Sequence, residues 1–260
     1  MDLIERHFSS AQSPKEGEHA PHRHDVGQFI LVRRGILYGH VERSNWVLKP
    51  GMAAWVPAGL VHWGSGSKGM ELAALYLTTA ESRHFSLPAG PLLSTPLMVA
   101  LCERLMDQGW VQDHPQRRQT MTAMLIEEIA EAQPASLVLP LPMDARLQRL
   151  TNTLMAAPRT LGEWGRQVGA SERTLMRLFL RDTGLSFHQW YDRFLLIEAV
   201  RNLDEGFGNA RIAERLGFAS ADSFGHWFRR VTGGSPSTYL MEKPSPRPLG
   251  RENGPVPSPT

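Results

Sequence analysis

The chain has 260 residues, of which 42% are hydrophobic and 21% are charged, and its formal net charge is +2. This composition is globular, and the length allows two ordinary domains, each with its own core. The longest apolar run, LAALYL at residues 72–77, is far shorter than the roughly 20 residues that span a bilayer, so no membrane partner is expected. A single cysteine, Cys102, excludes an intrachain disulfide, and the N-terminus lacks a cationic start followed by an apolar stretch. We therefore expect a cytoplasmic protein.

The charges are divided unevenly along the chain. Residues 1–143 carry 12 Lys/Arg and 14 Asp/Glu, a net charge of −2, whereas residues 144–243 carry 14 basic and 11 acidic residues, a net charge of +3. In the second segment 13 of the 14 basic residues are Arg. Such an Arg excess is compatible with phosphate contact, but charge alone favours a solvated helical surface.

Residues 17–79 predict a run of short β-strands. Segments rich in β-branched or aromatic residues, such as QFILVRR, ILYGHVE and ELAALYL, alternate with Gly and Pro turn signals. Many short strands with frequent turns are typical of a barrel or jelly roll, which we assign to residues 1–94.

From residue 95 the hydrophobic period becomes that of a helix. Apolar residues recur at every fourth position in two runs, Leu97, Leu101 and Leu105, and then Met121, Leu125 and Ile129. We predict two amphipathic helices within residues 95–132, joined through residues 109–113. Packing onto the barrel and forming a dimer interface explain the apolar stripes equally well.

The stretch QPASLVLPLP follows these helices and contains three prolines and no charge. It predicts an extended, stiff linker, which we place at residues 133–143. A helical domain is expected at residues 144–243, and the Pro/Gly/Ser-rich residues 244–260 predict a disordered tail.

The helical domain contains an internal repeat. The segment VGASERTLMRLFLRDTGLSFHQW at 168–190 aligns with LGFASADSFGHWFRRVTGGSPSTY at 216–239, with a constant offset of 49 residues from Ser171 and Ser220 onward. In each copy an apolar-periodic helix ends at a Gly, a Ser then provides an N-cap, and a second helix follows. This pattern predicts two helix–turn–helix units, whose second helices would enter DNA grooves.

The spacing of the buried positions predicts which residues of the two reading helices face outward. For Arg173 and Arg177, contact with a guanine base and contact with phosphate are both open. The expected DNA-contacting residues are Ser171, Glu172, Arg173, Met176, Arg177 and Arg181 in the first unit, and Ser220, Asp222, Ser223, His226, Arg229 and Arg230 in the second.

Residues 146–240 resemble the DNA-binding domain of the AraC/XylS family of bacterial transcription regulators. The resemblance is carried by ASERTLMRLFLRDTGLSFHQW and IAERLGFASADSFGHWFRRVTGGSPSTY. It implies an all-α domain that inserts into successive major grooves of promoter DNA, a homodimer, and RNA polymerase as a partner if the protein is an activator. Asp222 and Gly225 depart from what DNA affinity favours in the second reading helix.

The N-terminal half contains a second pattern, Gly17-x4-His22-x-His24-x3-Gln28-x6-Gly35, followed by Gly51-x5-Pro57-x-Gly59-x2-His62. It resembles the two motifs of the cupin superfamily, in which His22, His24 and His62 match metal-binding histidines. Gln28 replaces the usual Glu and removes the one anionic ligand. The candidate cofactor is thus a divalent transition metal, and the alternative is a polar cavity that binds an organic ligand without metal.

Together these observations predict an α+β protein of two domains, an N-terminal cupin barrel with a helix pair and a C-terminal double helix–turn–helix. The predicted function is a transcription regulator, not an enzyme, whose DNA binding responds to a small molecule or metal at His22, His24, Gln28 and His62. Two alternatives are a cupin isomerase or dioxygenase with a helical appendage, and a regulator whose barrel only mediates dimerisation.

Overall fold

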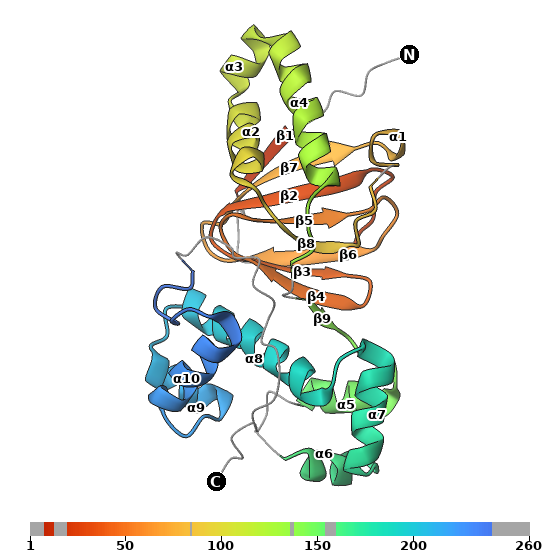
Figure 1. The fold of residues 1–260 in the computed structure, drawn as a ribbon, viewed down its shortest axis with the longest axis vertical. Coiled ribbons are helices and arrows are strands. Elements are labelled where there is room, and N and C mark those ends of the chain that lie inside the picture. The colour runs from red at the N-terminus through yellow and green to blue at the C-terminus, as the bar shows by residue number, and fades with distance from the viewer. Residues whose placement is uncertain (1–7, 13–19, 84, 136–137, 154–159, 241–260) are drawn as a thin grey trace. The chain divides into compact units, whose positions relative to one another are not determined.

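The computed structural model describes residues 8–12, 20–83, 85–135, 138–153 and 160–240 (Figure 1). The tail predicted at 244–260 lies outside these residues. Internal contacts divide the chain into two compact units. The first contains the described residues up to Glu42 and those of Trp46–Val138, and the second contains Arg43–Asn45 and the described residues from Leu139 to Leu240.

The strands form two sheets, with the orders β1-β7-β2-β5-β8 and β6-β3-β4-β9. The described strand pairs are antiparallel. The strands are β1 (Phe8–Gln12), β2 (Gly27–Arg34), β3 (Leu37–Val41), β4 (Ser44–Leu48), β5 (Met52–Val56), β6 (His62–Gly66), β7 (Glu71–Leu77), β8 (Gly90–Leu93) and β9 (Val138–Pro140). A sandwich of short antiparallel strands confirms the predicted class of the N-terminal domain.

Strand β2 is buried on both faces, which explains its uninterrupted apolar sequence. Ile30 and Val32 pack into a cluster between the sheets with Trp46 and Val56. The alternate residues, such as Phe29, pack into a second cluster together with helical residues. Since successive side chains of a strand point to opposite faces, the five-stranded sheet separates an interior core from an outer one.

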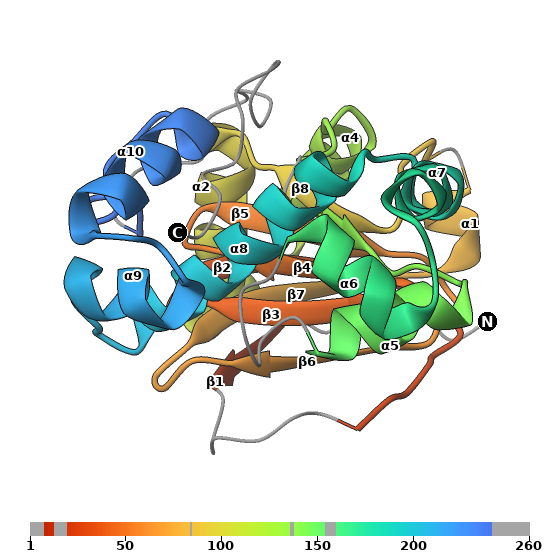
Figure 2. The same ribbon diagram turned by 90° about the horizontal axis from the view of Figure 1, so that it is seen from below.

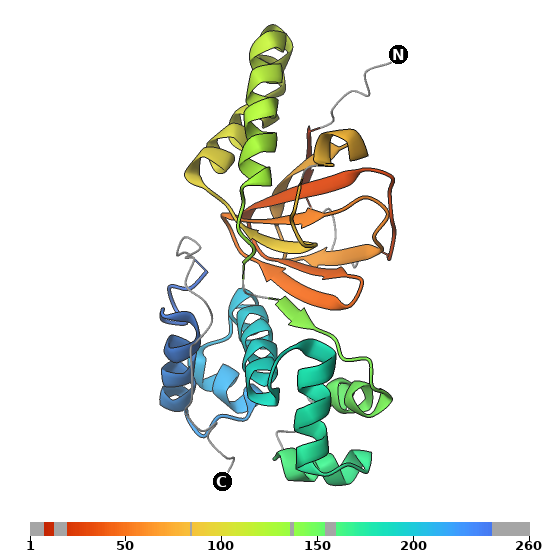
Figure 3. The ribbon, with the colours of Figure 1, turned by 45° about the vertical axis from the view of Figure 1, so that its right-hand side comes forward.

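The outer core is covered by helices α2 (Pro96–Met106) and α4 (Pro115–Ala130). The short helices α1 (Thr79–Ser82) and α3 (Gln108–Asp113) both contact α4. Figure 3 shows α4 as the long yellow-green helix beside the strands. Leu101, Leu105, Leu125 and Ile129 are buried in this core, and Met121 packs against it, as the two stripes predicted. Leu97 is a correction to the first stripe, because it is 41% exposed in the first turn of α2 and Met98 is the buried residue there. The joint expected at 109–113 is instead the short helix α3, because the Asp107 side chain accepts the backbone N–H of Trp110 and begins a new helix.

The second unit is helical. It contains α5 (Ala145–Thr153), α6 (Leu161–Val168), α7 (Glu172–Thr183), α8 (Phe187–Asp204), α9 (Asn209–Leu216) and α10 (Ala221–Thr232). Figure 2 shows α8 running between the α6–α7 pair and the α9–α10 pair. No helix in the described part of the chain is long and apolar enough to cross a membrane.

Two helix–turn–helix units are present, and the same local devices build both. Helix α6 ends at Gly169 and α9 at Gly217, with positive φ angles of 69° and 78°. The side chains of Ser171 and Ser220 then accept backbone N–H groups at the starts of α7 and α10. In the first unit the turn is tight, because a Cβ atom at Gly165 would lie 2.3 Å from the carbonyl oxygen of the turn.

Candidate functional site

Helix α7 exposes one face along its length. Leu175, Leu178 and Phe179 are buried, whereas Arg173 and Arg177 are exposed and contact no carboxylate among the described residues. Met176 and Leu180 lie on the same outward side, with 45% and 58% of their surface exposed. The outward face therefore combines two guanidinium groups with two apolar side chains. The sequence analysis missed Leu180, although its spacing of seven and three residues from Arg173 and Arg177 places it on the same face of the helix.

The serines and acids at the helix starts have local structural roles. Ser171 accepts the N–H of Thr174, and Ser220 accepts the N–H of Ser223. Glu172 and Asp222 lie in the first turns, where the positive end of the helix dipole stabilises a carboxylate. Ser171 and Ser220 thus cap the reading helices, and any DNA contact they make is additional to that role.

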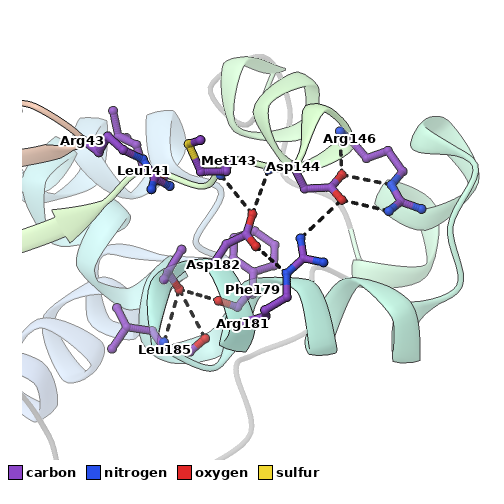
Figure 4. Close-up of polar contacts among 10 residues, drawn as sticks. Arg43, Leu141, Met143, Asp144, Arg146, Phe179, Arg181, Asp182 and Leu185 are labelled. Carbon is purple, nitrogen blue, oxygen red and sulfur yellow. Dashed lines mark hydrogen bonds and ion pairs between the residues drawn. The ribbon is translucent and has the colours of Figure 1, made fainter.

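Arg181 is held within a network of charges at the end of α7 (Figure 4). Its Nε atom donates to Asp182 at 2.7 Å, and its Nη2 atom lies 3.7 Å from Asp144. Asp182 is buried, and its carboxylate also accepts the backbone N–H groups of Met143 (2.9 Å) and Asp144 (2.7 Å). Arg181 therefore differs from Arg177, because its charge is already compensated.

These carboxylates are stabilised in their ionised form. The side chain of Arg146 donates two hydrogen bonds to Asp144, and this lowers the pKa of Asp144 to about 2. Burial raises the pKa of Asp182, but hydrogen bonds from Arg181 and from the backbone of Asp144 and Met143 outweigh it, and the pKa is lowered. The network therefore ties the chain that enters the helical unit to the end of α7.

Helix α10 presents a more mixed surface. Asp222, His226 and Arg229 are exposed, and Ser223 is half-buried. Arg230 lies 3.5 Å from Asp192 on α8, whose carboxylate also accepts the indole N–H of Trp227 at 2.7 Å. Gly225 is buried against the rest of the unit. Arg229 is thus the cation of α10 that faces outward without a carboxylate partner among the described residues.

The candidate ligand site lies at the start of β2 in the first unit. Gln28 lies on β2, whereas His22 and His24 precede that strand. His22 instead pairs by two backbone hydrogen bonds with His62, the first residue of β6, and the carbonyl of His24 accepts the N–H of Gly59. Backbone pairing between distant segments therefore brings the histidines together.

Each of these imidazoles has its Nδ1 atom against a backbone carbonyl. The partners are Ala20 for His22 (3.0 Å), Val26 for His24 (2.6 Å) and Leu60 for His62 (2.9 Å). A carbonyl oxygen only accepts hydrogen bonds, so Nδ1 carries the hydrogen in all three rings. In the neutral rings Nε2 is then the unprotonated nitrogen, which is the arrangement that orients histidine as a metal ligand.

The three rings face one another. Their centroids lie 4.3 Å (His22–His62), 4.8 Å (His24–His62) and 6.1 Å (His22–His24) apart, and their ligand atoms lie within 4.8 Å of one another. The Nε2 atom of His62 is buried and has no hydrogen-bond partner in the part of the chain that the structure describes. Burial lowers the pKa of His62, and the neighbouring His22 and His24 lower it further. The hydrogen bond to the carbonyl of Leu60 raises the pKa but does not outweigh these effects. A neutral His62 with an available nitrogen fits a cation or a hydrogen-bond donor.

Gln28 belongs to the same cluster, and Tyr76 is the residue that sequence reasoning missed. The Oε1 atom of Gln28 lies 3.4 Å from Nε2 of His24, and its Nε2 atom donates to the Tyr76 hydroxyl at 3.0 Å. Tyr76 lies on β7 directly opposite Gln28 in the strand register. This partner is 48 residues away, so only the strand pairing identifies it.

Comparisons with known proteins agree with this two-part arrangement. Residues 10–151 match the family model described as the AraC-like ligand binding domain, and residues 164–242 match a helix-turn-helix domain model. The chain is 29% identical over 242 residues to the HTH-type transcriptional regulator NimR of Escherichia coli (strain K12), with 87% of each chain covered. Over 103 residues it is 35% identical to the HTH-type transcriptional regulator RipA of Corynebacterium glutamicum, covering 38% of this chain and 31% of RipA.

Among solved structures, ToxT from Vibrio cholerae aligns with 90% of this chain and 97% of its own, at 10% sequence identity and a TM-score of 0.36. A TM-score at this level carries no argument about function. The ligand-binding-domain model spans the first unit and extends to residue 151 in the second, and the helix-turn-helix model lies within the second unit.

Proposed function

The chain belongs to the AraC-like family of DNA-binding transcription regulators with an N-terminal ligand-binding domain, and from this premise we propose which of its residues bind DNA and which bind the effector. Helices α7 and α10 enter successive major grooves of promoter DNA. The cluster of His22, His24, His62 and Gln28 holds the effector that controls DNA binding.

Arg173 and Arg177 are the proposed base-reading residues. The observation that carries this proposal is their exposure on the outward face of α7 without a carboxylate partner among the described residues. An arginine in this position is free to pair with the O6 and N7 atoms of guanine. Exposed Leu180 and Met176 offer apolar contact to thymine methyl groups.

The remaining predicted residues take supporting roles in this proposal. Arg181 and Arg230, whose charges are shared with Asp182 and Asp192, bind phosphate at most weakly. Arg229, His226, Asp222 and Ser223 make the contacts of α10, and the mixed charge of this set predicts that α10 supplies less affinity than α7. Glu172 and the caps Ser171 and Ser220 position the helices.

Operator binding tests this assignment. Footprinting upstream of the neighbouring genes first defines the operator. Arg177→Ala is then expected to weaken binding by about 5- to 150-fold, since one bidentate base contact contributes roughly 1–3 kcal/mol. Arg211→Ala removes the same charge from α9, where Arg211 is paired with Glu214, and should leave binding nearly unchanged. Equal losses in both variants would reduce Arg177 to a general electrostatic role.

The effector site is proposed to take a divalent transition metal or a small molecule. Three imidazole nitrogens and an amide oxygen are ligands that such metals accept. Neighbouring ligands of a tetrahedral ion lie about 3.4 Å apart at a metal–nitrogen distance of ~2.1 Å. A cluster whose ligand atoms lie within 4.8 Å of one another would therefore have to contract by about 1 Å to close around an ion. A bound metal would hold the segment before β2 and the start of β6 together.

Occupation of this site shifts the regulator between two states that differ in operator affinity. His62→Ala is expected to abolish metal binding and the effect of metal on DNA binding, measured by calorimetry and gel shift. His188→Ala removes an exposed histidine of α8 and serves as the control. An unchanged response in His62→Ala would exclude this cluster as the effector site.

Assembly and partners complete the proposal. We expect a homodimer on a two-site operator, and contact with RNA polymerase if the protein activates transcription. Leu97 and Met124, exposed by 41% and 47%, are the large apolar side chains of α2 and α4 that a dimer could cover. Analytical ultracentrifugation tests the dimer.

The competing function is a cupin metalloenzyme that uses the same histidines, and operator binding without turnover by the metal-loaded protein would exclude it.

A further inference from the structure

The donor set around His62 carries no negative charge. Among the described residues, the cluster that could hold an ion consists of His22, His24 and His62 and contains no Asp or Glu. The fourth donor, Gln28, is a neutral amide. Asp25 follows His24 in the sequence, but it is exposed and outside the cluster. A divalent cation at this site would therefore keep its full charge.

Tyr76 fixes the direction of the amide. The Gln28 Nε2 atom donates to the Tyr76 hydroxyl at 3.0 Å, which turns Oε1 toward Nε2 of His24 at 3.4 Å. Both of these atoms are acceptors when the imidazole is neutral, so a cation between them satisfies both. The Tyr76 hydroxyl accepts this bond and keeps its own hydrogen for another acceptor.

A second hydrogen-bond donor lies on the interior of the neighbouring strands. The indole N–H of Trp46 is buried and has no hydrogen-bond partner among the described residues. A Cβ atom at Gly39 would lie 2.2 Å from the six-membered ring of Trp46, so the indole covers Gly39 on the interior face. Gly39 pairs with Gly64, and two residues further along the same pair of strands Val41 pairs with His62. The Trp46 ring therefore lies over β3, two residues from the register partner of His62.

From these observations we infer that the site binds a metal ion together with an anionic ligand, and that a small carboxylate is the chemical class of that ligand. The anion supplies the negative charge that Gln28 lacks, since an uncompensated charge in a partly buried site is costly. The hydrogens of Tyr76 and Trp46 suit its oxygen atoms. This inference rests on the metal-binding form of the proposed function, and it makes the effector a pair, metal plus anion.

The full-length protein tests the inference with Co²⁺ as the metal and with azide and acetate as probe anions, in buffer free of other coordinating anions. Either anion is expected to change the ligand-field absorption of the Co²⁺ protein and to raise its apparent Co²⁺ affinity several-fold. Gln28→Glu provides the missing charge. This variant should bind Co²⁺ about 10-fold more tightly than the wild type and respond less to either anion. Trp46→Phe should weaken the acetate effect.

Thermal melting checks that each variant is folded. Co²⁺ binding that neither anion affects would overturn the inference while leaving the metal site in place. Failure of both the wild type and Gln28→Glu to bind Co²⁺ would overturn the metal site itself and this inference with it. An acetate effect of unchanged size in Trp46→Phe would overturn the carboxylate as the ligand class, because the Trp46 N–H is one of the two donors proposed to hold it.

Discussion

Replacement of Asp182 by Ala should destabilise the helical unit more than any change on its outward faces. The Asp182 carboxylate is only 5% exposed and accepts the backbone N–H groups of Met143 and Asp144 at 2.9 and 2.7 Å. A hydrogen bond to a charged group contributes roughly 1.5–3 kcal/mol. Met143 is exposed, so water can replace its bond, whereas the N–H of Asp144 is partly buried. We expect a loss of about 2–3 kcal/mol in the free energy of unfolding.

Urea unfolding and hydrogen exchange measure this effect in the full-length protein. The amides of Met143 and Asp144 should exchange faster in Asp182→Ala, and the midpoint of the helical unit should fall. Asp182→Asn keeps an acceptor oxygen and should lose less. Asp222→Ala, which removes an exposed carboxylate at the start of α10, is the matched control and should change stability by less than about 0.5 kcal/mol. A loss in Asp182→Ala no larger than in this control, with unchanged exchange, would refute the reasoning.

Three further predictions concern the turn, the charges and the thiol. Gly165→Ala should lower the free energy of unfolding by about 1–3 kcal/mol, because its Cβ would lie 2.3 Å from a backbone oxygen. Gly225→Ala is the control, since its Cβ would meet nothing closer than 3.8 Å, and similar unfolding curves for both variants would contradict the prediction. The pKa of Asp144 is lowered to about 2 from 3.8 by the hydrogen bonds and charge of Arg146, so its contribution to stability is complete above about pH 5 and is lost as the pH falls toward 2. The stability gap between wild type and Asp144→Asn, up to about 2 kcal/mol, should therefore shrink between pH 5 and 2.5 in urea titrations, and a constant gap would argue against it. Burial raises the pKa of Cys102 to about 12, so the thiol of the folded protein should react slowly with a disulfide reagent at pH 8. The same thiol should react quickly in the urea-unfolded protein. Fast reaction in both states would mean that the thiol is accessible in the folded protein.

The helical unit was predictable because its signals are local. Gly169 and Gly217 adopt the left-handed conformation, and Ser171 and Ser220 cap the following helices, as the repeat indicated. The partners of the charged side chains could not be predicted from the sequence. Whether Arg181 is available for DNA depends on where Asp144 and Asp182 fold, and periodicity places a side chain on a face without naming its partner.

The first unit was predictable as a class of fold but not in its details. Strand β6 was missed because Gly64 and Gly66 are turn signals in isolation, although in the sheet they are cross-strand neighbours of β3. The histidine motif identified His22, His24 and His62, but their approach comes from backbone pairing between His22 and His62. Tyr76 became visible only through its register with Gln28.

The segment that leads into the helical unit has a consequence for the construction of hybrid regulators. The carbonyl of Pro140 accepts the indole N–H of Trp190 at 2.7 Å, and that of Pro142 accepts the Gln148 amide at 3.2 Å. Both main-chain groups of Leu141 bond to Arg43. A DNA-binding module excised at residue 144 would lose the partners of Trp190 and Gln148, whereas one excised before Leu139 would carry them along. The useful point of exchange between regulators is therefore before Leu139, within the proline-rich stretch, rather than at the end of that stretch.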